Sequence, residues 1–114
     1  SKLAASGYAS KLAASGYASQ LAASGYASKL AASGNYSKLA ASGNYSKLAA
    51  SGDDSIVMGA GLRSTAKAGK NGALAIAWHD GERNRIAVGY VGEDGIQADT
   101  WYRADDGKLV EVQS

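Results

Sequence analysis

The sequence predicts an all-β protein: a two-sheet parallel β-solenoid, with 18-residue coils made of two nonapeptides, and a C-terminal antiparallel β cap. Three observations lead to this prediction. Near-identical nine-residue units fill residues 1–54, an alternating pattern begins at Ala73, and Gly, Asn, Asp and Ser separate the segments. We expect the solenoid to span 1–72, with a degenerate last coil, and the capping unit to span 73–114.

The first half of the chain repeats one phrase. Its units are SKLAASGYA at 1–9 and 10–18, SQLAASGYA at 19–27, SKLAASGNY at 28–36 and 37–45, and SKLAASGDD at 46–54. A helix is disfavoured because nine residues make two and a half turns, which would point successive Leu to opposite sides. As a strand, each unit places Leu3 and Ala5 on one face and Lys2, Ala4 and Ser6 on the other. Gly and its successors would then form a turn, and Gly-Asn and Gly-Asp are expected to suit left-handed backbone.

One unit supplies one strand and one turn, so two units are needed to close a coil. Equivalent strands of successive coils would stack at about 4.8 Å. The expected core therefore consists of two facing ladders: Leu3, Leu21 and Leu39, and Leu12, Leu30 and Leu48. Neutral Gln20 falls between Lys2 and Lys38 in an outward ladder, where it would relieve like-charge repulsion, and Tyr8 is expected to stack under Tyr26.

The SKLAASG units resemble nonapeptide-repeat β-solenoids, whose best-known form is the calcium-binding parallel β-roll of RTX proteins. Those proteins repeat GGxGxDxUx and bind calcium through Asp, whereas the turns here contain no Asp before Asp53. The resemblance implies the architecture without the calcium chemistry. The chain also resembles uncharacterised phage and prophage proteins with SxLAASGDxS repeats and a small C-terminal unit, matched here by AWHDG, VGEDGI, TWYR and DGKLVEV. That resemblance implies no activity.

The repeat changes its residues before it ends. Residues 55–63 and 64–72 keep the nine-residue spacing, with Val57 and Ala66 at the Leu position, and predict a degenerate fourth coil. The preceding Asp53 and Asp54 are interpreted as turn residues in preference to a weak cation site.

The C-terminal residues predict antiparallel strands that cap the array. ALAIAWH and RIAVGYV, joined by DGERN, indicate a hairpin. IQADTWYRA would be a third strand or an irregular crossing, and KLVEV a last strand after DDG. This unit would cover the last coil, whereas the N-terminal coil begins with an intact repeat and would expose an unpaired strand edge.

Composition excludes several classes of function. Net charge is +2, with +3 on residues 1–54 and −1 on 55–114, too weak a bias to indicate nucleic acid or an anionic membrane as partner. The chain has no Cys, so it holds no disulfide and no thiolate metal site. We expect no signal peptide in these residues and no membrane span, because no apolar run is long enough, and the residues indicate no compartment.

No catalytic, cofactor-binding or metal-binding residues are assigned, and we expect no enzyme. His79 beside Asp80 could suggest an acid–base pair, but the two fit a hairpin turn and have no nucleophile nearby in sequence. The many Ser are interpreted as turn residues and outward ladders, since none lies in GxSxG. GAGLRS and AGKNGA lack the GK[ST] of a phosphate-binding loop.

The leading functional hypothesis is a structural or self-associating module, a rigid spacer that forms a homo-oligomer. The candidate interfaces are the open N-terminal edge and the flat Ala/Ser faces. Their residues are Ala4, Ala13 and Ala22 on the faces and Tyr8, Tyr17 and Tyr26 at the edges. The alternative is a binding or adhesion module for a glycan or a protein, using the Tyr edges or the cap aromatics Trp101 and Tyr102. Ice binding ranks lower, because Thr occurs only at positions 65 and 100.

Overall fold

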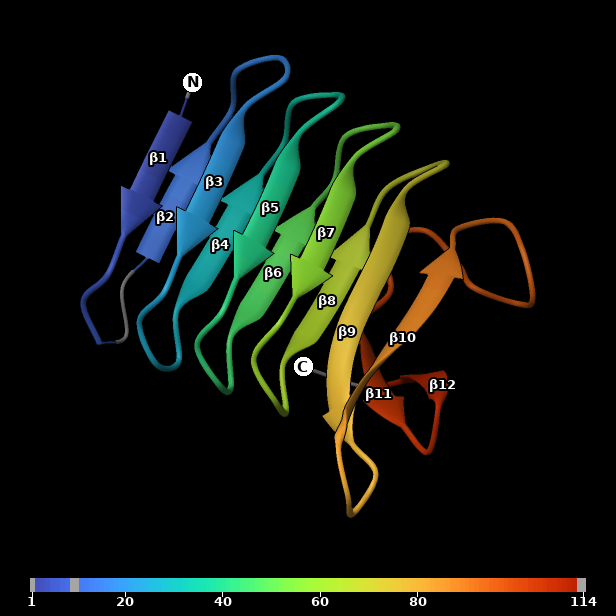
Figure 1. The fold of residues 1–114 in the computed structure, drawn as a ribbon. Helices are drawn as coiled ribbons and strands as arrows, with labels where there is room; N and C mark the ends of the chain where they lie inside the picture. Colours follow the sequence, from blue (N-terminus) through green and yellow to red (C-terminus); the bar gives the residue numbers. More distant parts are fainter. Residues whose placement is uncertain (1, 9–10, 113–114) are drawn as a thin grey trace.

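The computed structural model describes residues 2–8 and 11–112, and it confirms the all-β fold (Figure 1). The strands of the repeat have four residues each: β1 (Lys2–Ala5), β2 (Lys11–Ala14), β3 (Gln20–Ala23), β4 (Lys29–Ala32), β5 (Lys38–Ala41), β6 (Lys47–Ala50), β7 (Ile56–Gly59) and β8 (Thr65–Ala68). The C-terminal strands are β9 (Ala73–His79), β10 (Asn84–Tyr90), β11 (Tyr102–Asp105) and β12 (Lys108–Glu111).

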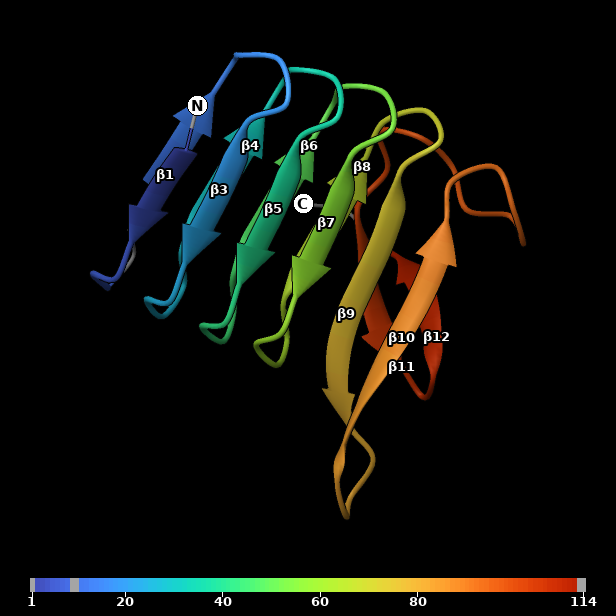
Figure 2. The same ribbon diagram turned by 45° about the horizontal axis from the view of Figure 1, so that its top comes forward.

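Among the described residues the strands form two layers (Figures 1 and 2). Sheet A has the order β1-β3-β5-β7-β9-β10, and sheet B has the order β12-β11-β8-β6-β4-β2. Consecutive strands of the repeat lie in opposite sheets, and each pairs in parallel with the strand two further on. Lys2 lies opposite Gln20, and Lys11 lies opposite Lys29, so one coil takes 18 residues as predicted. The first two strands, β1 and β2, lie at the sheet edges.

The core is a thin layer between the sheets. Leu3 pairs with Leu21, which pairs with Leu39 and then Val57. The second ladder runs from Leu12 through Leu30 and Leu48 to Ala66. From the second coil onward these Leu are at most 2 % exposed, and each buried Leu side chain contributes about 1.5–3 kcal/mol.

From Ser19 onward, the first residue of the unit also points into the molecule, so the assignment of all Ser to turns and outward ladders was wrong. The buried hydroxyls belong to Ser19, Ser28, Ser37, Ser46, Ser55 and Ser64, which are 0–1 % exposed. Ser28 Oγ donates to the carbonyl oxygen of Gly25 at 2.8 Å, and Ser37, Ser46 and Ser55 repeat the contact three residues back. Ser is small enough to fit between coils, and its hydroxyl finds a hydrogen-bond acceptor in its own turn. The alternating pattern of the strand gives no indication of this burial, because the Ser lies outside the strand.

The repeated Gly serves close packing between coils, and the prediction of left-handed backbone at Gly-Asn and Gly-Asp was wrong. Positive φ occurs instead at the last residue of the unit, between 56° and 62°: Ala18, Ala27, Tyr36, Tyr45, Asp54 and Arg63. A Cβ on Gly43 would lie 2.0 Å from the carbonyl oxygen of Gly25 in the preceding coil. The turns therefore stack too closely for a side chain at this position.

A shortened turn ends the regular array. Ile56 lies opposite Ala73, a spacing of 17 residues instead of 18, and the left-handed residue of this turn is Asn71. Gly72 takes the place of the buried Ser, and a Cβ there would lie 2.5 Å from the Cβ of Ala68. The nine-letter spacing of 64–72 concealed this change of register.

The C-terminal strands continue both layers. The β9 strand pairs in parallel with β7 and antiparallel with β10, which confirms the hairpin. The β11 strand is antiparallel to β8 and β12, with Tyr102 opposite Ala66. Residues 91–101 cross irregularly from one sheet to the other. Because β9 belongs to the stacked coil and to the hairpin, no loop separates the solenoid from the cap.

Candidate functional site

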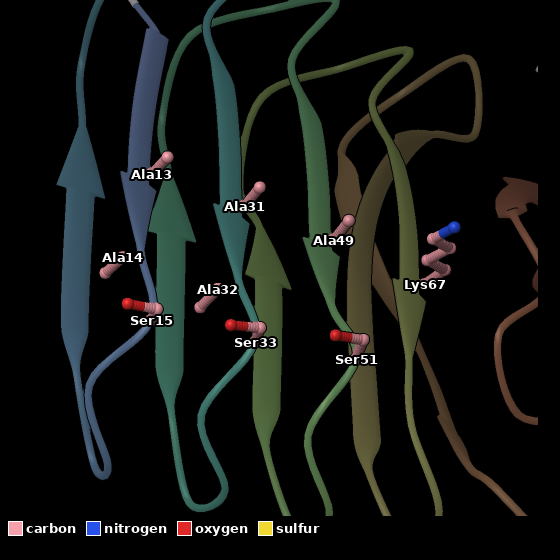
Figure 3. A pocket seen from close by; sticks show the side chains of 9 residues that line it. All are labelled: Ala13, Ala14, Ser15, Ala31, Ala32, Ser33, Ala49, Ser51 and Lys67. Atoms are coloured by element: carbon pink, nitrogen blue, oxygen red, sulfur yellow. The ribbon is translucent and has the colours of Figure 1, made fainter.

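The outer face of sheet B carries the expected flat Ala/Ser rows. Figure 3 shows Ala13, Ala31 and Ala49 in one row and three Ser in a parallel row, with Lys67 at the end of the Ala row. Lys67 Nζ lies 5.1 Å from the ring centroid of Trp101, a cation–π contact. A further outward row contains Lys11, Lys29 and Lys47. This face therefore carries rows of small side chains and a row of basic ones, and Trp101 lies at its C-terminal end.

The outer face of sheet A is more apolar. The register aligns Ala4, Ala22, Ala40, Met58, Ala75 and Val88 across all strands of the sheet. Five large apolar side chains cluster over β7 and β10, and we call them the apolar patch: Ile56, Met58, Ile86, Val88 and Tyr90. Their exposed fractions run from 41 % for Ile56 to 66 % for Ile86. Sequence reasoning singled out Ala4 and Ala22 but missed the patch, because the patch depends on β10 lying beside β9.

Opposite charges flank the apolar patch at one end of the strands. Lys38 pairs with Ile56, Ile56 with Ala73, and Ala73 with Tyr90, so these residues form one transverse row. The row continues through Gln20 to Lys2 at the N-terminal side. At its other side, the exposed Glu93 and Asp94 follow Tyr90 in the chain. The face is thus basic toward β1 and acidic beyond β10.

The repeat tyrosines stack along the edges of the coils. Tyr8 and Tyr26 have ring centroids 5.2 Å apart and an interplanar angle of 10°, which confirms the predicted stacking. Tyr26 also contacts Tyr45 at 5.4 Å, and on the other edge Tyr17 contacts Tyr36 at 5.5 Å, both in tilted geometry. The rings thus contact one another along each edge, while Tyr8 and Tyr17 remain more than 70 % exposed.

The aromatics Trp101 and Tyr102 do not form a shared platform. Tyr102 is 4 % exposed, and its hydroxyl accepts a hydrogen bond from the backbone N–H of Gln97 at 2.8 Å. It belongs to the core, whereas Trp101 contacts Lys67 on the outer face. Their adjacency in sequence puts them on opposite sides of β11, as alternation requires.

His79 and Asp80 are part of a hairpin turn. Asp80 Oδ1 accepts the backbone N–H groups of Glu82 and Arg83 at 2.8 Å, and Oδ2 pairs with the Arg85 guanidinium. The Arg85 hydrogen bond, followed by the two backbone N–H groups, holds the pKa of Asp80 well below its ordinary value. His79 Nδ1 accepts the N–H of Gly81 at 3.1 Å, so this ring nitrogen contacts the turn backbone.

A recess opens beneath the last coil, between the two layers. The β9 strand has seven residues, of which the first four pair with β7, so Ala77, Trp78 and His79 extend past the coil. These residues line one wall, β11 lines the opposite wall, and the turn at 62–64 lies between them. Sequence reasoning missed this recess, because it arises from the unequal lengths of β7 and β9.

Comparisons with known proteins leave the chain without an assigned family. No protein-family model matches it, and neither a curated protein nor a solved structure matches. Within residues 2–8 and 11–112, no three His, Asp or Glu side chains gather closely enough to hold a metal ion. The described part of the chain also has no helix long and apolar enough to cross a membrane.

Proposed function

We propose that the chain is a non-enzymatic structural module, a short rigid β-solenoid that forms a homodimer through the outer face of sheet A. The observation that carries this proposal is the apolar patch. Clustered large apolar side chains on a flat sheet face are characteristic of interaction surfaces. The resemblance of the units to phage and prophage repeat proteins is compatible with a structural role.

The repeated contacts suit a rigid element. From the second coil onward, each coil places a buried Ser hydroxyl against a Gly carbonyl and seats its Gly against the preceding coil. Because every coil contacts only its neighbours through the same set of groups, the geometry propagates along the array. Function in such a module depends on its faces and not on one special residue.

The distribution of charge favours a second copy as the partner on sheet A. A two-fold axis parallel to the strands, between β7 and β9, would lay β10 of one protomer over β5 of the other. Lys38 of each protomer would then approach the other protomer's loop that holds Glu93 and Asp94. The apolar patches would face each other at the centre, surrounded by these complementary charges.

The test is the molar mass in solution, measured by light scattering from well below to well above micromolar concentration. The wild-type protein should have twice the mass of the chain at high concentration. Val88→Glu should raise the dissociation constant roughly 30-fold or more, because it places an unpaired charge in the contact. The matched control is Ala31→Glu, which puts the same charge on the exposed outer face of sheet B.

Each other outcome has a definite meaning. A monomer at every concentration would refute self-association. Dimerisation that survives Val88→Glu but is lost in Ala31→Glu would move the interface to the Ala/Ser rows of sheet B. Survival in both variants would instead implicate one of the remaining predicted interfaces, the open edges of β1 and β2 or the Tyr edges of the coils.

A further inference from the structure

The recess beneath the last coil has the composition of a binding site for an anion. Two arginines from separate elements line it, Arg63 from the last turn of the array and Arg103 from β11, together with His79 from the end of β9. Among the described residues that line it, none is Asp or Glu. Three residues with hydrogen-bond donors, from three separate elements, thus line one opening, and no carboxylate is among the residues that line it.

Several polar groups in the recess are free to form hydrogen bonds with a ligand. His79 Nδ1 accepts the N–H of Gly81, which leaves Nε2 as the ring nitrogen available for a ligand. Arg103 pairs with Asp105 at 3.4 Å, but both side chains are about half exposed, so this pair is weak and can yield to a ligand. Within the described residues, the buried Thr65 hydroxyl, also in the lining, has no hydrogen-bond partner.

Aromatic side chains complete the lining. Trp78 is partly buried and Tyr45 is 47 % exposed, and both line the recess. Aromatic rings pack against the flat apolar face of a sugar, while the donors suit its hydroxyl and anionic oxygens. The remaining lining residues are neutral: Leu62, Ser64, Ala77 and Ala104. The recess therefore matches a ring that has one apolar face and a negative charge.

We infer that this recess binds an acidic saccharide, with Arg63 and Arg103 pairing to its carboxylate or sulfate and Trp78 packing against its ring. This site is separate from the apolar patch, since none of the patch residues lines the recess. A solenoid dimer that presents two such recesses would hold two acidic sugars at a fixed separation.

Tryptophan fluorescence can report the binding directly. The chain has two Trp, so Trp101→Phe leaves Trp78 as the single reporter inside the recess. The probes are digalacturonate for the carboxylate, a sulfated galactose disaccharide for the sulfate, and neutral galactobiose. We expect saturable quenching by one acidic probe and at least about tenfold weaker binding of the neutral one, because a charged hydrogen bond is lost.

Variants then assign the binding to the two arginines. Arg63→Gln and Arg103→Gln should each weaken the acidic probe about tenfold, while Arg83→Gln, which removes the same charge from the exposed hairpin outside the lining, should leave it unchanged. Two independent Arg variants guard against one that fails to fold. The inference is overturned if no acidic probe saturates, if galactobiose binds equally well, or if Arg83→Gln weakens binding as much as the recess variants. Loss of dimerisation in the Val88→Glu variant leaves this assay unaffected.

Discussion

Glycine occurs in the turns that follow strands in both halves of the molecule, but for different physical reasons in the two. In the coils, Gly43 has no room for a side chain, because its Cβ would lie 2.0 Å from the carbonyl oxygen of Gly25. In the C-terminal hairpin, Gly81 has open space around it and a φ of +102°. In the coil, Gly is required because a side chain would collide with a residue 18 positions away. In the hairpin, Gly is favoured because the backbone has a positive φ.

The same contrast extends to the other residues of the two regions. A coil residue contacts its equivalents before and after it, so its role follows from its position in the unit. In the C-terminal region each role belongs to an individual residue, such as Asp80, which binds the turn backbone and Arg85. Substitutions should therefore affect the coils through neighbouring coils and affect the cap locally.

The largest effect is expected for Gly43→Ala. The added methyl group meets backbone and cannot move aside, so we expect a loss of about 3 kcal/mol in the free energy of unfolding. Gly81→Ala, which meets only an unfavourable φ, should cost about 1 kcal/mol. Urea denaturation of both variants measures the difference. Equal losses would mean that the coils do not approach as closely as described.

A smaller effect is expected for Ser37→Ala in the same array. The buried hydroxyl donates to the Gly34 carbonyl oxygen at 2.8 Å and is lost without replacement, which should cost about 1–2 kcal/mol. Ser42→Ala is the matched control, since Ser42 is exposed on the outer face, and it should change stability by less than about 0.5 kcal/mol. If the two variants unfold at the same urea concentration, the buried Ser ladder contributes nothing.

The smallest effect is expected for the stability of the β9–β10 hairpin at low pH. The pKa of Asp80 is lowered in the folded state, so its contribution to stability is complete above its unfolded value of 3.8 and declines as the pH falls below it. Amide hydrogen exchange should therefore lose protection in β9 and β10 in acid before it does in the coils. Asp80→Asn should abolish this pH dependence. Equal acid sensitivity of the coils would contradict the local character of the cap.

Much of the array follows from the sequence, because a strict period fixes both strand alternation and coil length. Leu at one position and Lys beside it identify the inner and outer faces without further information. The first Ser of the unit was misassigned, because its direction depends on how the turn closes and not on the strand. The repeated Gly was misread for a similar reason, since its close contact is with another coil.

The candidate surfaces were harder to predict than the strands. Ala4 and Ala22 could be placed on a flat face from alternation alone, but Val88 joins their row only through a hairpin and a turn shortened by one residue. The recess of Arg63 and Arg103 unites residues that are 40 positions apart in the chain. No local pattern marks such a site, because it is created by one strand extending beyond its neighbour.

The alternation of units between the two sheets sets a parity rule for changes in array length. Near-identical units invite loss or gain of whole repeats during copying of their coding sequence. Loss of two units removes one coil and returns every remaining strand to its own sheet. Loss of one unit moves every strand on its N-terminal side to the opposite sheet, which exchanges the Gln20 row with the all-lysine row. Heritable length variants of this array are therefore expected to differ by even numbers of units.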